Sequence, residues 1–299
     1  MSPVELPEEY PKLPSSAPPV LLLTPPRVSE RSALASAASF GLRADRRLGA
    51  LRVDARTVEY SEASIHHRLF RASGGLQHRD VSRWMRGDLR RPFEVSDRDA
   101  VRMALQAALA VPALSGRTEG PSSVKRLHVA SSSKEGKSRS DVVTHVAVQF
   151  RRVERGILAD GPGGMITVFV HPDGRASGFD LLWRPAGKVF RESEGLVEPR
   201  NAVEEVIRNW ARRGLRSGRV TQVRFGYLEL DWTSKQRLLQ PAYVVFGVFH
   251  GPVGKARFGR IEAVHASTSP AGPLLPPRPR LVRTFPQRGN KSTQPRPGP

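Results

Sequence analysis

The sequence predicts an α+β protein with two lobes, in which a helix followed by an antiparallel β-meander is repeated along the chain. Three segments have the apolar spacing of amphipathic helices, and after each of them the apolar period falls from about 3.6 residues to about 2. Proline- and arginine-rich stretches at both termini predict disordered tails, because they cannot bury enough apolar surface to offset the entropy of ordering.

Start and stop signals define the three helices, which are expected within residues 28–42, 95–112 and 198–214. In the first, Ser29 is a candidate N-cap and Gly41 suits the position just after the helix. In the second, Ser96 precedes Asp99 in an acidic variant of the capping box. In the third, Pro199 lies in the first turn, and apolar residues recur at the spacing of a buried stripe.

Alternating apolar residues predict the strands of each meander. After the first helix they are expected within residues 48–60, 65–73 and 76–85. After the second they are expected within residues 142–153, 165–170 and 175–184, and after the third within 219–232, 240–249 and 258–266. A helix that precedes a meander is expected to lay its apolar stripe on one face of the sheet.

The densest apolar run, AYVVFGVF at residues 242–249, is expected to be a central strand of the last unit. Both of its faces are apolar, so the helix should cover one face and other residues should cover the second. Pro241 has no N–H for a β-ladder and is expected at the first position of this strand.

Composition divides the chain into five parts. The disordered tails are expected at residues 1–28 and 269–299, the N-terminal α+β lobe at 29–114, a linker at 115–141 and the C-terminal α+β lobe at 142–268. The linker assignment rests on the abundance of serine, glycine and charged residues between the second helix and the next predicted strand.

Four short motifs suggest a family. The helix start EPRNAVEEV, the strands VRFGYLEL and LQPAYVVF, and the final strand IEAVHAS together resemble the PepSY and thermolysin-propeptide class of domains. The tandem arrangement is similar to that of the YycH/YycI regulators of bacterial sensor kinases. The resemblance covers residues 100–266 and implies a PepSY-like C-terminal lobe.

The resemblance implies a non-enzymatic protein-binding module: a regulator, or a peptidase inhibitor or folding aid that acts in trans. The expected partner is another protein, either a peptidase or an envelope-associated protein. Similar families are usually extracytoplasmic, but the N-terminus lacks the basic region and long apolar stretch of a signal peptide, so the localisation is left open. No apolar run reaches the ~18 residues of a transmembrane helix, and none is expected.

The net charge of +20 gives a second interpretation. The alternative function is sequence-neutral binding of nucleic acid or another polyanion through dispersed arginines and the basic C-terminal tail. The dispersion of the arginines over every segment is also what the codon composition of a GC-rich genome would produce. The candidate polyanion-binding residues are Arg278, Arg280, Arg283, Arg288 and Lys291.

Residue types and spacings give no catalytic, cofactor or metal site. The chain has no cysteine, which removes disulfides, thiolate ligands and thiol nucleophiles. Its eight histidines have no metal-binding spacing, and the neighbours His66 and His67 would point to opposite faces of a strand. The glycine-rich DGPGGM, residues 160–165, is expected to be a connection whose glycines take positive φ angles for local reasons.

Overall fold

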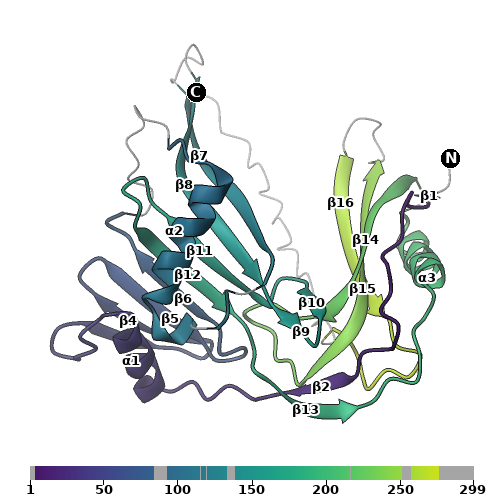
Figure 1. The fold of residues 1–299 in the computed structure, drawn as a ribbon, viewed down its shortest axis with the longest axis horizontal. Helices are drawn as coiled ribbons and strands as arrows, with labels where there is room; N and C mark the ends of the chain where they lie inside the picture. The colour runs from purple at the N-terminus through teal and green to yellow at the C-terminus, as the bar shows by residue number, and fades with distance from the viewer. Residues whose placement is uncertain are drawn as a thin grey trace, which may run out of the picture.

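The computed structural model describes residues 4–83, 93–114, 116–118, 120–132, 139–215, 217–250 and 257–275 (Figure 1). Its three α-helices confirm the three predicted ones: α1 (Glu30–Ser39), α2 (Asp97–Leu109) and α3 (Pro199–Arg212). Ser29 Oγ accepts a backbone N–H bond at the start of α1, and Ser96 Oγ does the same for α2, each at 3.1 Å. The local capping signals therefore act as the sequence predicts.

Eight antiparallel strands form the first sheet, in the order β3-β4-β5-β6-β12-β11-β8-β7. Helices α1 and α2 cover one of its faces (Figure 1). The strands are β3 (Ala50–Val53), β4 (Thr57–Glu62), β5 (Ile65–Phe70), β6 (Leu76–Asp80), β7 (Ser122–Ser132), β8 (Arg139–Arg151), β11 (Met165–Val170) and β12 (Ala176–Leu182).

The predicted repeat of helix-plus-meander units is wrong, because strands from two expected units merge into this one sheet. The joining contact is β6 with β12, where Leu76 lies opposite Leu181. Two helices then share one face, and buried residues of both, such as Ala33 of α1 and Ala104 of α2, belong to one apolar cluster. β7 also lies within residues 115–141, which were expected to be a linker. The fold is therefore mostly β, with two large sheets and three helices in the described residues.

The second sheet also has eight strands, with β13-β2-β15-β14-β10-β9 as its main order, β1 beside β14 and β16 beside β15. Helix α3 packs on one face. The strands are β1 (Val4–Glu5), β2 (Val20–Leu23), β9 (Val153–Glu154), β10 (Ile157–Asp160), β13 (Ala186–Arg191), β14 (Gly218–Leu228), β15 (Leu238–His250) and β16 (Arg257–His265).

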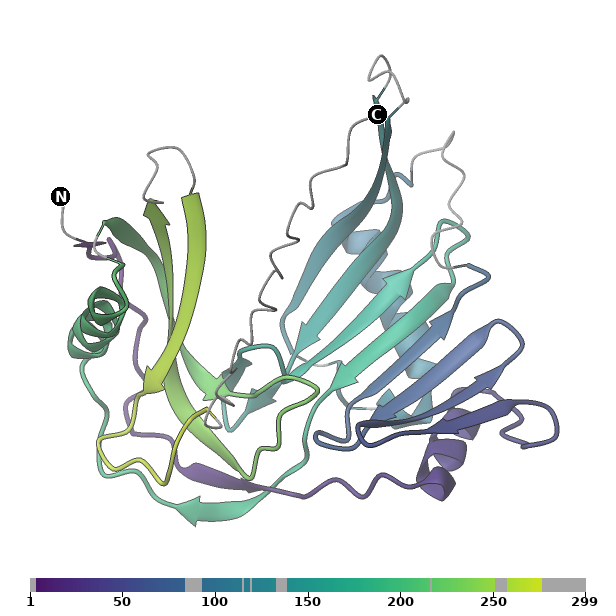
Figure 2. The same ribbon diagram turned by 180° about the vertical axis from the view of Figure 1, so that it is seen from behind.

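The N-terminal segment, expected within a disordered tail, supplies two strands of this sheet. Strand β2 lies between β13 and β15, and Val20 and Leu21 are fully buried. Figures 1 and 2 show that the two sheets stand side by side, splay apart at one end and meet at the other through β9, β10 and the segments around them. Helix α3 lies on the side of the second sheet that faces away from the first sheet.

Strand β15 contains the dense apolar run and lies between β14 and β16, as the sequence predicts. Tyr243 and Val245 pack with α3, whereas Ala242 and Val244 pack on the opposite face in a second apolar cluster that includes Leu274. Both faces of the strand are therefore covered. Gly247 is required here, because a Cβ at this position would lie 2.8 Å from the buried ring of Trp210 on α3.

Pro241 lies inside β15 and not at its first position. The strand begins at Leu238, because β2 pairs with Leu238 and Leu239 before β16 begins opposite Ala242. Pro241 falls where one neighbour has ended and the next has not begun, so its missing N–H removes no ladder bond on that side.

Candidate functional site: the open edge of β14

Strand β14 has one complete edge and one incomplete edge. Along the first it pairs antiparallel with β15, and on the second it pairs in parallel with β1 at Gly218–Arg219 and with β10 at Tyr227–Leu228. Within the described residues no strand pairs with this second edge between Arg219 and Tyr227. We call this stretch the open edge. It is bracketed by two partners that run in the same direction as β14.

The register identifies the backbone groups that face the open edge. Pro241 has no N–H, and its carbonyl accepts the N–H of Ala266 at 3.1 Å, so Pro241 is not hydrogen-bonded to Tyr227 opposite. Antiparallel pairs alternate between bonded and non-bonded. Val223 and Phe225, two and four residues before Tyr227, therefore turn their N–H and C=O groups away from β15 and toward the open edge.

Residues 6–19, LPEEYPKLPSSAPP, run beside this edge without pairing with it, and we call them the arch. Five of them are prolines, which have no N–H for a ladder. Leu13 packs into the α3 core, the carbonyl of Pro18 accepts the Ser193 hydroxyl at 2.7 Å, and that of Pro19 accepts the Tyr227 hydroxyl at 2.8 Å. The arch is thus held at its far end and in its middle.

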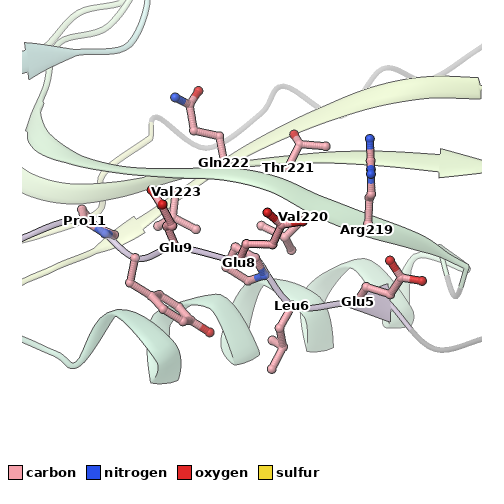
Figure 3. A pocket seen from close by; sticks show the side chains of 12 residues that line it. Glu5, Leu6, Glu8, Glu9, Pro11, Arg219, Val220, Thr221, Gln222 and Val223 are labelled. Atoms are coloured by element: carbon pink, nitrogen blue, oxygen red, sulfur yellow. The ribbon is translucent and has the colours of Figure 1, made fainter.

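The arch is longer than the stretch of β14 beside which it runs. From Arg219 to Tyr227 a strand spans about 26 Å, at roughly 3.3 Å per residue. From Glu5, opposite Arg219, to Pro19, the chain could span about 46 Å. The surplus lets the arch bow away from β14, and a pocket of about 550 Å³ lies between residues 5–11 and residues 219–223. We call this pocket the slot (Figure 3).

Acidic side chains dominate the slot. Glu5, Glu8 and Glu9 are exposed, and Arg219 is the only basic residue among the lining residues. In Figure 3, Glu8 and Glu9 extend from the arch toward β14, whereas Leu6 points the opposite way. A β-bulge at Thr221 interrupts the ladder with β15 at this place. Together these features make a preformed slot with an acidic rim, beside an edge of β14 that no described strand pairs with.

A buried ionic cluster fixes β10 and β14 where the two sheets meet. Glu229, fully buried, accepts the backbone N–H of Arg184 at 2.7 Å and lies 3.4 Å from the guanidinium of Arg184 and from that of Arg152. Burial raises the pKa of Glu229, and the hydrogen bond from Arg184 and the charge of Arg152 oppose that rise. Arg152 also pairs with Glu154. The cluster holds one wall of the site in place.

The glycines of DGPGGM serve this cluster. Gly161 and Gly164 have positive φ angles of 92° and 67°, as expected from the sequence. The structure adds a second reason, since a Cβ on Gly163 would lie 2.6 Å from the carbonyl of Leu230 and 2.8 Å from Cγ of Glu229. The loop is glycine-rich because its backbone packs directly against the buried carboxylate residue.

Histidines of β5 and β6 form a buried pair. His66 and His67 point to opposite faces of β5, as predicted: His66 contacts Glu59, while His67 is buried with its Nδ1 3.3 Å from Nδ1 of His78. Over the described ranges, no three side chains of the metal-binding types gather in one place. The same ranges contain no helix long and apolar enough to cross a membrane.

The predicted polyanion-binding residues cannot be placed. Arg278, Arg280, Arg283, Arg288 and Lys291 lie outside the described residues, so polyanion binding by this tail stays a prediction. The slot was missed by sequence reasoning, because the acidic, proline-rich N-terminus was taken for a tail. Its prolines were the available signal: they mark a segment that can lie beside a strand without pairing with it.

Comparisons with known proteins give the fold alone. No family model and no curated protein matches the sequence. Among solved structures, an uncharacterised protein from Eubacterium rectale is similar, with a TM-score of 0.52 and 8% sequence identity over 85% of this chain and 84% of that chain. These findings do not test the resemblance to PepSY domains, which stays a prediction.

Proposed function

We propose that this protein is a non-enzymatic binding module that holds an extended segment of another protein at the open edge of β14. The observation that carries the proposal is the edge of β14 that no described strand pairs with, where the register directs the N–H and C=O groups of Val223 and Phe225 away from β15 and beside a preformed slot. An extended peptide that adds to a sheet edge gains main-chain hydrogen bonds from the strand. The bound peptide would run parallel to β14, as β1 and β10 do.

The arch supports this function in preference to pairing between sheets. Exposed edge strands are usually shortened, charged, bulged or covered, which prevents pairing with a second sheet. Here the bulge at Thr221 and the arch restrict access, while the slot remains open to a single extended chain. Its volume of about 550 Å³ lies within the ~300–1,000 Å³ typical of ligand pockets. A regulator or an inhibitor of a peptidase could use such a site, and both roles stay predictions.

Filling the slot is expected to weaken peptide binding by about tenfold or more. The chain has no cysteine, so Glu8→Cys introduces a unique thiol on the face of the arch that is directed toward β14. Alkylation with iodoacetate restores a carboxylate of similar size, whereas pyrenyl maleimide adds a bulky group. The probes are dye-labelled peptides of about seven residues in which valine alternates with lysine, threonine or glutamate, and their fluorescence anisotropy is measured.

We expect at least one peptide to bind the iodoacetate-treated variant and to lose about tenfold or more in affinity after pyrenyl labelling. Glu194→Cys, an exposed position outside the lining, is the matched control and should tolerate both reagents. Equal binding before and after pyrenyl labelling at residue 8 would exclude the slot as the binding site.

A further inference from the structure

The charge of the slot narrows the class of partner. We propose that the segment bound there is basic, with lysine or arginine side chains that pair with Glu5, Glu8 and Glu9 while its backbone adds to β14. This inference rests on the proposed function and adds the chemistry of the ligand. A strand in the slot places every second side chain on the same face. An alternating basic pattern therefore suits the acidic rim best.

The lack of ion-pair partners for the three glutamates supports a basic ligand. The chain has 48 basic and 28 acidic residues, so carboxylates are the scarcer partner, and several described ones are paired, including Glu59, Asp180 and Glu262. Glu5, Glu8 and Glu9 are exposed, and none of them forms an ion pair with another residue that the structure describes. Residues 5–9 therefore carry three unpaired negative charges, although the net charge of the chain is +20.

The location of the acids connects them to the open edge. Glu5 ends β1, whose pairing with β14 stops at Arg219, and Glu8 and Glu9 follow where the arch bows outward. Pro7 lies between them and cannot extend the β1 ladder. A bound segment that begins beside Val220 would therefore have carboxylates along one side and the β14 backbone along the other. Such complementary charge raises association rates and selects among partners.

The same three peptides test the inference with the full-length protein. We expect the valine–lysine peptide to bind about tenfold or more tightly than the valine–threonine peptide at low salt, and the valine–glutamate peptide to bind weakest. Because exposed charges are screened, the preference should shrink as salt rises from about 0.05 M to about 0.5 M. Backbone N-methylation of the lysine peptide on its bonded edge should abolish binding by removing main-chain donors.

Charge reversal gives a matched control. The double variant Glu8→Lys/Glu9→Lys should invert the preference toward the glutamate peptide. Glu192→Lys/Glu194→Lys makes the same change in net charge at exposed residues outside the slot and should keep the original order.

The outcomes separate the two proposals. If the threonine peptide binds as tightly as the lysine peptide and N-methylation still abolishes binding, the basic ligand is wrong and the edge-binding function stands. If no peptide binds, or N-methylation has no effect, the edge-binding function itself fails. Equal loss in both double-lysine variants would mean that binding follows the net charge of the chain, which contradicts a site at the slot.

Discussion

Glu229→Ala is expected to destabilise the folded protein by about 3–5 kcal/mol, the usual cost of removing one partner from a buried ion pair. The substitution leaves Arg152 and Arg184 buried, each about 1% exposed, without the carboxylate between them. Arg184 would keep its bonds to the carbonyls of Leu230, Asp231 and Ser234, and Arg152 would keep Glu154. Those remaining partners are the reason that the expected loss does not exceed this range.

Urea unfolding, followed by tryptophan fluorescence, measures the effect. Glu194→Ala is the control, because its side chain is exposed and has no partner among the described residues, so the change should alter the free energy of unfolding by less than about 0.5 kcal/mol. The loss of unfolding free energy in Glu229→Gln should lie between those of Glu194→Ala and Glu229→Ala, since an amide keeps the shape and the acceptor oxygen but loses the charge. A Glu229→Ala free energy within about 1 kcal/mol of wild type would show that the cluster does not stabilise the junction.

Mild acid is expected to destabilise the protein through His67 and His78. Burial lowers the pKa of His67 to about 3, with a further contribution from His78, and burial and then the charge of Arg79 lower the pKa of His78 to about 4. Ser36 of α1 lies 3.0 Å from Nε2 of His67, and Phe40 stacks on His78, so the pair lies directly under that helix. Asp80 is the nearby carboxylate and only partly offsets the effect on His78.

Proton binding by the unfolded chain determines the direction in which stability changes with pH. Below the ordinary histidine pKa of about 6.5, the unfolded chain binds a proton at each site while the folded chain does not, so stability is full above this pH and falls below it. Each histidine contributes about 1.4 kcal/mol per pH unit within its window. Acidification from about pH 6.5 to 5 should therefore cost up to about 4 kcal/mol from the pair.

Urea unfolding between pH 7 and 5 tests this. The variant His78→Leu keeps an apolar contact with Phe40 and Phe179 and removes one buried imidazole, so its acid sensitivity should fall by about half of the contribution of the pair. His66→Gln is the matched control, since His66 is adjacent in sequence but faces the other side of β5 and is partly exposed. A pH profile that is the same in His78→Leu and wild type would contradict this account of acid sensitivity.

The sequence predicts the local structure well, because its signals act over a few residues. Helix caps such as Ser29 and Ser96 satisfy backbone groups within the same turn, and α1 and α2 begin beside them. Alternation likewise located β14, β15 and β16. His67 was correctly assigned to the opposite face from His66 for the same local reason.

The pairing of strands that are distant in the sequence could not be predicted from the sequence. Leu76 and Leu181 meet across β6 and β12, yet nothing in either strand identifies its partner, and the two expected units merged as a result. In β2 the four residues VLLL lie between prolines, so composition predicted a tail although burial between β13 and β15 makes a strand. The open edge depends on which strand ends where, so only the assembled sheet could show it.

The central claim is that β14 has a free backbone edge that an extended segment completes, and amide hydrogen exchange tests it residue by residue. In the free protein the N–H groups of Val223 and Phe225 should exchange much faster than those of Gln222 and Arg224, whose alternate register directs them to β15. With a saturating bound peptide, Val223 and Phe225 should become protected while Gln222 and Arg224 change little. If Val223 and Phe225 are already protected in the free protein, or stay unprotected when peptide is bound, β14 is not the binding edge.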